Sequence, residues 1–376
     1  MTGIRIARLE PLVFRAPIPV PVRTSFGVMH ARPALLVRAE DGEGAVGWGE
    51  IWCNFPACGA EHRARLVTTV LADWVKEAPF ADPAAVWRRL SARARILAIQ
   101  AGEPGPLAHA IAGIDIALWD LAARRAGQKL WRHLGGAGSG VVKVYASGIN
   151  PDGAMDTALG HRAAGHRAFK LKVGFGRERD LANMAALRQA LGADTPVMID
   201  ANQAWDVATA LDMARALAPF GPAWLEEPIP ADSTDADWGR LAAEQPLPLA
   251  AGENMRGERE FEWAIGSGHF AVVQPDLAKW GGFSGCLPVA RAALAAGRRF
   301  CPHYLGGGIG LVASAHLLAA AGNDDLLELD GNDNPLRAVL AQPYPAVTDG
   351  RMALPDGPGL GVAPDLEAAR EFLVAD

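Results

Sequence analysis

Eight short apolar segments recur between residues 141 and 327, and helical patterns fill the spaces between them. Eight strand–helix units in about two hundred residues predict a TIM-type barrel, in which residues that follow the strands meet at one face. The predicted strands are Val141–Ala146, Phe169–Val173, Pro196–Ile199, Ala223–Leu225, Leu247–Ala250, Ala271–Val273, Arg299–Cys301 and Leu326–Leu327.

An ionisable residue stands at the end of nearly every predicted strand, at intervals of 23 to 28 residues. Scattered surface charge would not keep step with the period of a barrel. The period therefore indicates a functional site at the carboxyl ends of the strands. In chain order these residues are Lys172, Asp200, Glu226, Glu253, Asp276, His303 and Glu328.

Three carboxylates, Asp200, Glu226 and Glu253, follow three adjacent strands and are expected to converge. Mg²⁺ prefers such all-oxygen ligands, whereas zinc prefers nitrogen and sulfur. The alternative is ordinary charge at the rim of the barrel, but three unpaired carboxylates in one pocket would repel each other strongly without a cation. The expected cofactor is therefore Mg²⁺.

Two basic groups are expected to flank these carboxylates on opposite sides. Lys170 and Lys172 share one face of a strand, so that each should lower the pKa of the other and move it towards a general base. On the other flank, Asp276 can orient the imidazole of His303 and raise its pKa. This layout suits removal of a proton α to a carboxylate, because a cation between the bases stabilises the enediolate.

The barrel is expected to carry a second domain. Residues 1 to about 130 alternate as strands and then become helical, which predicts an α+β capping domain. The predicted catalytic barrel covers residues 131–340, and residues 341–376 are expected to return to the capping domain. The proline-rich segment Pro17–Arg32 is predicted to be a loop with Arg23, Phe26 and His30 as exposed candidates.

Composition excludes several classes of partner. The chain has 376 residues, half of them hydrophobic, and a net charge of -6 without basic clusters, which argues against nucleic acid or a membrane surface. No segment is expected to span a membrane. Unpaired spacings of the four cysteines predict reduced thiols and a cytoplasmic protein. The cysteines are Cys53, Cys58, Cys286 and Cys301.

In the order and spacing of its motifs, the chain resembles the mandelate racemase subgroup of the enolase superfamily. The matching motifs are Gly47-Trp48-Gly49-Glu50, Gly113–Asp120, Lys170-x-Lys172, Asp200-x-Asn202, Glu226-Glu227-Pro228, Gly252-Glu253-Asn254, Asp276 with Gly281-Gly282, His303, Glu328 and Gly357–Gly361. The resemblance implies a modified (β/α)7β barrel with a capping domain, Mg²⁺, a small carboxylate substrate and a homo-oligomer.

Roles for individual residues follow from the same resemblance. It implies that Lys172 is the base on one face and that His303, paired with Asp276, is the acid or base on the other. Lys170 would contact the substrate carboxylate, and Glu328 would be held protonated to hydrogen-bond the enediolate. Tentative substrate contacts are Asn202, Arg23, Trp52 and Tyr304.

What the chain lacks narrows the expected reaction. Muconate-lactonising enzymes and dipeptide epimerases carry lysine where this chain has Asp276, and Lys279 is interpreted as a loop charge that does not replace it. Galactonate-dehydratase-like members carry histidine where Asn202 stands, which disfavours that activity. Dehydration of a sugar acid to a 2-keto-3-deoxy acid is the first choice; a racemase or epimerase and a sugar-lactone cycloisomerase remain alternatives.

Two other classes of function stay open at this point. The run from Gly308 to Ala313 fits the dinucleotide-binding pattern G-x-G-x-x-A, which would indicate an NAD-dependent dehydrogenase. It follows the seventh strand of the predicted barrel rather than opening a βαβ sheet, which argues against that interpretation. A non-catalytic sugar-acid-binding protein on the same scaffold is the other alternative.

Overall fold

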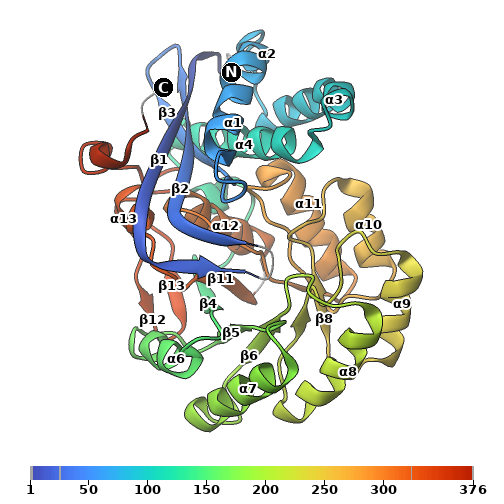
Figure 1. Ribbon diagram of the computed structural model, residues 1–376. Coiled ribbons are helices and arrows are strands. Elements are labelled where there is room, and N and C mark those ends of the chain that lie inside the picture. The colour runs from blue at the N-terminus through green and yellow to red at the C-terminus, as the bar shows by residue number, and fades with distance from the viewer. Residues whose placement is uncertain (1–2, 25–26, 323, 375–376) are drawn as a thin grey trace.

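The computed structural model describes residues 3–24, 27–322 and 324–374. The amino-terminal part forms a three-stranded antiparallel sheet in the order β1 (Ile6–Arg23), β2 (Val28–Asp41) and β3 (Val46–Ile51). Figure 1 shows this sheet and its helices lying over one end of the barrel. The helices are α1 (Gly59–Leu66), the π-helical turn η1 (Val67–Leu71), α2 (Ala72–Lys76), α3 (Pro83–Ala101), α4 (Pro104–Arg125) and α5 (Leu130–His133).

The prediction of a loop at Pro17–Arg32 is wrong, because most of this segment is β-strand. Strand β1 continues to Arg23, β2 begins at Val28, and the two remain paired with one register shift between Pro17 and Val22. Proline is tolerated here because β1 is an edge strand, where a missing N–H breaks few ladder bonds. Phe26, named as a candidate, lies outside the described residues.

Helix α4 packs directly on β3, and small residues allow this close approach. A Cβ on Gly49 would lie 2.0 Å from the carbonyl oxygen of Gly113 in α4. Contrary to the sequence expectation, α4 is long and apolar enough to match a membrane span by length and composition, the one such helix among the described residues. Its apolar window is 83% buried, however, and the helix serves as the core of the capping region.

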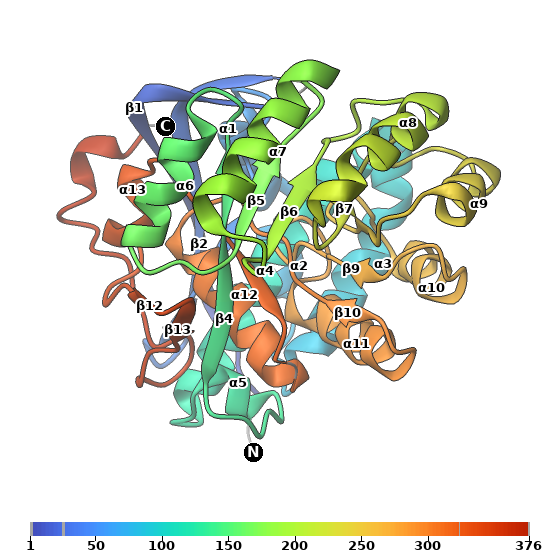
Figure 2. The same cartoon turned by 90° about the horizontal axis from the view of Figure 1, so that it is seen from below.

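Eight parallel strands and seven intervening helices form the predicted (β/α)7β barrel (Figure 2). The first and last strands, β4 and β11, pair with each other. The backbone N–H of Glu328 in β11 also donates to the carbonyl oxygen of Pro302, just after β10, at 3.4 Å. The strands are β4 (Val141–Ile149), β5 (Phe169–Lys172), β6 (Val197–Asp200), β7 (Leu225–Glu226), β8 (Leu249–Ala251), β9 (Val272–Val273), β10 (Arg299–Phe300) and β11 (Leu326–Asp330).

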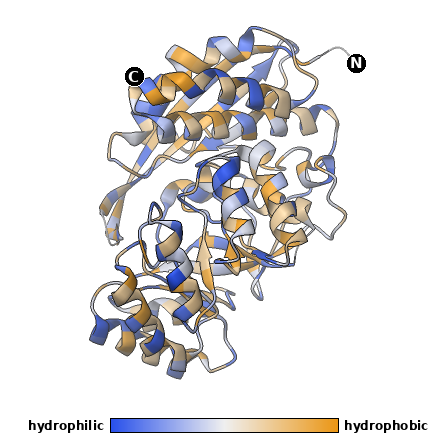
Figure 3. Cartoon of the chain, turned by 90° about the vertical axis from the view of Figure 1, so that its right-hand side faces the viewer, coloured by the Kyte–Doolittle hydropathy of each residue, from blue (hydrophilic) through white to orange (hydrophobic). Residues whose placement is uncertain are grey.

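The barrel helices cover the outside of the strands. Figure 3 shows hydrophilic and hydrophobic stretches alternating along them, as expected for helices with one face on a core. They are α6 (Ala154–Ala163), α7 (Arg177–Leu191), α8 (Val207–Leu217), with the 3-10 turn η2 (Ala218–Phe220) after it, α9 (Asp235–Glu244), α10 (Glu258–Gly266), α11 (Gly282–Ala295) and α12 (Gly308–Ala321).

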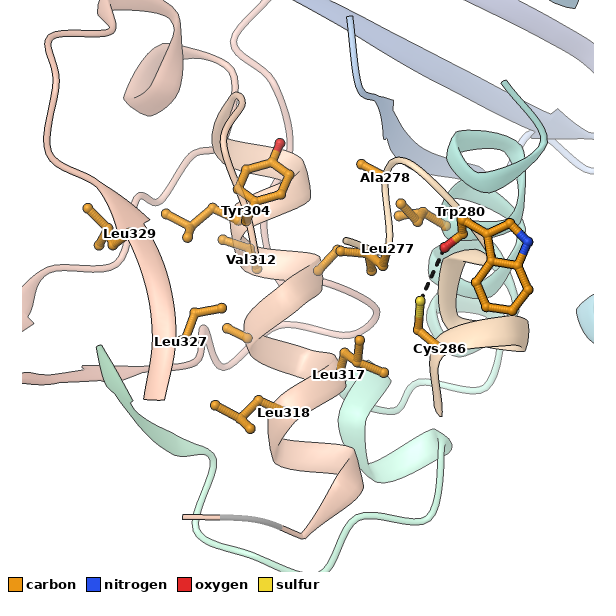
Figure 4. Close-up of a cluster of buried hydrophobic side chains, with 14 of the residues drawn as sticks. Leu277, Ala278, Trp280, Cys286, Tyr304, Val312, Leu317, Leu318, Leu327 and Leu329 are labelled. Carbon is orange, nitrogen blue, oxygen red and sulfur yellow. Dashed lines mark hydrogen bonds between the residues drawn. The ribbon is translucent and has the colours of Figure 1, made fainter. Parts of the chain in front are cut away.

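Helix α12 is buried on all sides. Figure 4 shows its Val312, Leu317 and Leu318 beside Leu327 and Leu329 of β11 and next to the loop that follows β9. Further along, the thiol of Cys286 donates to the carbonyl oxygen of Trp280 at 3.1 Å. All four cysteines are free thiols, as the sequence predicts.

The carboxyl-terminal segment binds both parts of the molecule. Strand β13 (Arg351–Ala353) pairs with the barrel strand β4, whereas Val374 N donates to Val13 O in β1 at 2.9 Å. The tail therefore pairs first with a barrel strand and then with the capping sheet. Its other elements are α13 (Pro335–Val339), β12 (Val347–Thr348) and the 3-10 turn η3 (Arg370–Phe372).

Candidate active site

Three neighbouring strands present charged side chains at the same level of the barrel. Lys172 is the register partner of Asp200, and Asp200 is the register partner of Glu226. In-register residues of parallel strands point to the same face, so all three side chains line the mouth. The ammonium of Lys172 lies 2.6 Å from Asp200 Oδ2. Lys170, one step deeper, contacts Glu226 Oε1 at 2.5 Å and Glu328 Oε1 at 2.8 Å.

Lys170 lowers the pKa of Lys172, as expected, but this repulsion does not decide the net direction of either shift. Burial lowers the pKa of Lys170, but Glu226 and Glu328 overcome that effect and raise it well above its usual value. Burial likewise lowers the pKa of Lys172, yet Asp200 raises it further, and the net shift is upward. Each ammonium faces a carboxylate, which outweighs the repulsion between the two lysines.

On the other side of the mouth, His303 is held between two carboxylates. Its Nδ1 lies 2.8 Å from Asp276 Oδ2, and its Nε2 contacts Glu253. Burial lowers the pKa of His303, but Glu253 and Glu328 raise it well above the usual range, with help from the Asp276 hydrogen bond. These carboxylates therefore favour the protonated imidazole, and Asp276 orients the ring. Asp276 is itself fixed by the amide of Ala278 at 2.8 Å.

Glu253 reaches its position because the residue before it is glycine. Gly252 has φ +144°, and a Cβ there would lie 2.8 Å from the backbone of Gln274 in the neighbouring strand loop. Burial raises the pKa of Glu253, but His303 and Lys279 lower it well below its usual value. Glu253 is therefore an anion that contacts two cationic side chains.

The three predicted metal ligands are neighbours but do not form a preformed cage. Within the described residues, no group of three or more His, Cys, Asp or Glu side chains is arranged to hold a metal ion. Glu226 accepts from Lys170, from Trp224 Nε1 at 3.1 Å and from Gln274 Nε2 at 2.9 Å. Lys170 and Lys172 thus contact oxygen atoms of Glu226 and Asp200, two of the residues predicted to bind Mg²⁺.

The chemistry of the donor set nevertheless fits a hard cation. Burial raises the pKa of Glu226 to about 7; Lys170 opposes this, whereas repulsion from Asp200, Glu328 and Glu253 adds to it. This raised pKa indicates that the lysines do not fully neutralise the negative charge of the carboxylates around Glu226. Buried carboxylate oxygens short of positive charge are suitable ligands for Mg²⁺.

The surroundings of Glu328 favour its ionised form. Burial raises its pKa, but Lys170 and His303 lower it below the usual value. It also accepts hydrogen bonds from the hydroxyl of Ser147 and, at 3.4 Å, from the amide of Tyr304.

The tentative substrate contacts fall in different places. Asn202 accepts a hydrogen bond from Lys172 Nζ at 2.7 Å and therefore positions that lysine. Tyr304 is only 2% exposed and packs in the core, with its hydroxyl beside Gly306 and Gly310. Arg23 is exposed at the end of β1. Trp52 lies against the site, because its ring is 4.9 Å from the ammonium of Lys279.

Sequence reasoning missed a group of residues around Trp52. Lys279 lies 3.6 Å from Glu253 Oε1 and is 7% exposed, so that it is more than the loop charge it was taken to be. His109 packs edge-on against Trp52 at 5.2 Å between ring centroids. The scarcity of lysine in this arginine-rich chain was the available signal for Lys279.

A (β/α)7β barrel with acid–base groups at its strand ends, covered by an α+β domain, defines an enzyme of the enolase superfamily. Residues 8–135 match the family model of the mandelate racemase / muconate lactonizing enzyme N-terminal domain, and residues 154–369 match the enolase C-terminal domain-like model. The chain belongs to the mandelate racemase / muconate lactonizing enzyme family.

Solved structures and named relatives agree with this family. A mandelate racemase/muconate lactonizing enzyme from Bordetella bronchiseptica RB50 is 57% identical, with a TM-score of 0.93 over 98% of this chain and 99% of that one. A racemase from Streptomyces coelicolor with bound magnesium is 31% identical, with a TM-score of 0.89 over 98% and 100%.

Among relatives with an assigned activity are lyases and isomerases that act on sugar acids. D-galactarolactone cycloisomerase from Agrobacterium fabrum is 36% identical over 92% of this chain and 92% of its own length. D-galactonate dehydratase from Xanthomonas euvesicatoria is 32% identical, also over 92% of each chain.

Proposed function

We propose that this enzyme removes the proton α to the carboxylate of a sugar acid, with Lys172 and His303 as the two proton-transferring groups. The observation that carries the proposal is their arrangement at the two ends of one charged cluster. Lys172 contacts Asp200 at 2.6 Å, whereas His303 contacts Glu253 and is oriented by Asp276. A substrate bound between them would meet a proton-transferring group on each face.

Neighbouring carboxylates raise the pKa of both groups and favour the protonated form of each. The group that accepts the proton from the substrate must therefore first lose its own proton. This becomes easier when the carboxylate beside it binds another cation, because its pKa then falls. Asp200 and Glu253 are the carboxylates in question, and both are candidate metal ligands. Asn202 would keep the amine of Lys172 in place during this change, because it accepts from Nζ at 2.7 Å.

We further propose that Asp200, Glu226 and Glu253 hold Mg²⁺. The cation would supply positive charge opposite the carboxylate of the substrate as negative charge develops there. The raised pKa of Glu226, caused by burial and by neighbouring carboxylates, supports a cation in this cluster, as does the magnesium in the Streptomyces coelicolor racemase.

For the overall reaction we propose dehydration to a 2-keto-3-deoxy acid. Lys172 or His303 takes the proton from the α-carbon, and the bond from the β-carbon to its hydroxyl group breaks. Protonated His303 is suited to give its proton to the departing hydroxide, which leaves as water; the resulting enol then becomes the keto acid. The cationic state of His303 in this structure is the state that such a step needs.

A sugar-lactone cycloisomerase is the second candidate, because relatives that are 36% and 34% identical have cycloisomerase names. Incubation of acid sugars and their lactones in D₂O, followed by NMR, separates these reactions. A 2-keto-3-deoxy product supports dehydration, whereas a rearranged lactone supports cycloisomerisation. Deuterium exchange at the α-carbon alone indicates a racemase or epimerase.

The same experiment tests the two alternatives that do not remove an α-proton, a binding protein and a dehydrogenase. If a broad panel of acid sugars binds but shows neither product nor exchange, a binding protein becomes the better account. A requirement for a nicotinamide cofactor would overturn the proposal in favour of a dehydrogenase. A cytoplasmic location and a homo-oligomer remain predictions.

A further inference from the structure

A small cavity adjoins the charged cluster on the His303 side. Its volume is about 180 Å³, and it lies where the loop after β3 meets the loops after β8 and β9. The two parts of the molecule are in contact here, because Trp52 N donates to Ala278 O at 3.3 Å. The residues that line the cavity are Trp52, His109, Glu253, Asn254, Arg256 and Lys279.

The walls of this cavity are rich in hydrogen-bond donors. The indole N–H of Trp52 is buried and has no hydrogen-bond partner in the described part of the chain. His109 accepts from Arg63 Nε at its Nδ1 atom (2.9 Å), so the neutral ring carries its proton on Nε2. Burial, followed by the charges of Arg63, Lys279 and Arg256, lowers the pKa of His109 and keeps this ring neutral.

Among the residues that line the cavity, Arg256 and Lys279 carry positive charge and Glu253 is the one with a carboxylate. Arg63 is 3% exposed, and its side-chain hydrogen bonds go to His109 and to the carbonyl oxygens of Gly59 and Phe55, none of them an anion. The carboxylate of Glu103 attracts Arg63 but is itself paired with His62 at 3.0 Å. An unpaired buried charge is costly, and a bound anion would offset that cost.

The one carboxylate in the wall is shared. Glu253 contacts His303 as well as Lys279, whose ammonium also donates to Asn254 Oδ1 at 3.2 Å. Lys279 lies 4.9 Å from the centroid of the Trp52 ring, which fixes the ammonium at the boundary between the charged cluster and the cavity. An anionic group that entered from the reacting centre would meet Lys279 first.

We propose that this cavity binds the distal carboxylate of the substrate, so that the enzyme acts on sugar acids that carry a carboxylate at both ends. The inference rests on the proposed function for the placement of the reacting carboxylate in the neighbouring cluster. The volume of the cavity lies below the range of about 300–1,000 Å³ that is usual for a pocket holding a whole small molecule. It is suited to a terminal carboxylate, which accepts from Lys279 and from neutral N–H donors.

Galactarate and galactonate are suitable probes, because they differ at C6, where one has a carboxylate and the other a hydroxymethyl group. Binding of each is measured by calorimetry on Lys172→Met enzyme with Mg²⁺, a background in which turnover is suppressed. We expect galactarate to bind at least about 30-fold more tightly, as for a hydrogen-bonded charge. Adding Lys279→Met, which keeps the contact with Trp52, should remove this preference, and galactonate, which lacks the distal carboxylate, reports any loss of binding that comes from the contact of Lys279 with Glu253.

Lys143→Met is the matched control, because Lys143 pairs with Asp324 at the surface, and it should leave the preference unchanged. Trp52→Phe, which removes only the orphaned N–H and part of the ring, should reduce the preference several-fold and serves if Lys279→Met does not fold. Equal binding of the two acids, or equal weakening of both by Lys279→Met, overturns the inference.

Failure of the proposed function is distinguishable from failure of this inference. If wild-type enzyme turns over neither acid but the binding preference persists and depends on Lys279, the cavity assignment stands and the reaction assignment fails. If galactonate is turned over as efficiently as galactarate, with kcat/KM unaffected by Lys279→Met, the reaction assignment stands and the cavity assignment fails.

Discussion

The carboxylate of Glu50 in β3 accepts hydrogen bonds from the backbone amides of Gly307 and Gly310 at the start of α12, the second at 2.8 Å. The capping sheet thereby supplies a buried carboxyl group to the amino terminus of a barrel helix. Of the two glycines in the run that resembles a dinucleotide motif, Gly310 is the one that donates its amide to Glu50, and a Cβ there would lie 2.1 Å from the hydroxyl oxygen of Tyr304. The place where a phosphate would bind is already filled.

Replacement Glu50→Gln should therefore destabilise the protein. The substitution keeps the shape but replaces one of the two acceptor oxygens by an NH₂ group, which leaves one backbone amide without its acceptor and should cost about 1–3 kcal/mol in the free energy of unfolding. Urea denaturation followed by circular dichroism measures the change. Glu43→Gln is the control, because that side chain is 74% exposed and should change little. Equal stability of Glu50→Gln and wild type would contradict the docking role.

The two proposed proton-transferring groups can be separated by isotope exchange. Lys172→Met and His303→Asn should each lower kcat by about 10²- to 10⁴-fold, because each removes one general acid or base. Exchange of the α-proton with D₂O should persist in one variant and vanish in the other, since each group serves one face of the substrate. NMR of the substrate pool measures this directly. Exchange that is lost equally in both variants would contradict a two-faced site.

The proposed metal site predicts a stabilisation by Mg²⁺ that does not depend on turnover. At a Mg²⁺ concentration 100 times Kd, the free energy of unfolding of the wild type should rise by about 2.7 kcal/mol. Asp200→Asn should lose most of this increment, whereas Asp212→Asn, at an exposed ion pair with Arg177, should keep it. Thermal denaturation with and without EDTA measures the increments. The same increment in Asp200→Asn would indicate binding elsewhere.

Much of the barrel could be predicted from the sequence because its signal is local and periodic. Each strand is a short apolar run, and the charged residue after it has a fixed place in the repeat. The positions of Asp200, Glu226 and Glu253 on neighbouring strands therefore followed from spacing alone. Strand pairing between Pro17 and Arg32 was missed because prolines usually indicate loops, and edge strands are the exception.

The electrostatic state of the site could not be predicted from the same pattern. The sequence places Lys170 beside Lys172, but only the fold shows that Lys170 contacts Glu226 at 2.5 Å and that Lys172 contacts Asp200 at 2.6 Å. These attractions outweigh the repulsion between the two lysines. The cavity beside Glu253 was missed for a related reason. Arg63, His109 and Lys279 come from three distant elements, and no short motif contains them.

The buried histidine of α12 predicts how stability depends on pH. His316 accepts from Trp131 N at its Nδ1 atom (3.0 Å), and its Nε2 donates to Leu360 O at 3.1 Å. Burial lowers its pKa from 6.5 to about 4; the Leu360 contact opposes this, and Lys129 lowers it further. A second proton would have to sit on Nδ1, where it would meet the N–H of Trp131.

The sign of the effect follows from these two pKa values. Above pH 6.5 the histidine is neutral in both folded and unfolded protein and contributes no slope. As the pH falls from 6.5 towards 4, the unfolded chain binds a proton that the folded protein does not bind. The free energy of unfolding therefore falls by about 3 kcal/mol in total. His316→Gln does not titrate and should reduce the slope of unfolding free energy against pH in this window. Urea titrations at several pH values measure the slope, and an unchanged slope in His316→Gln would show that other groups set the acid limit.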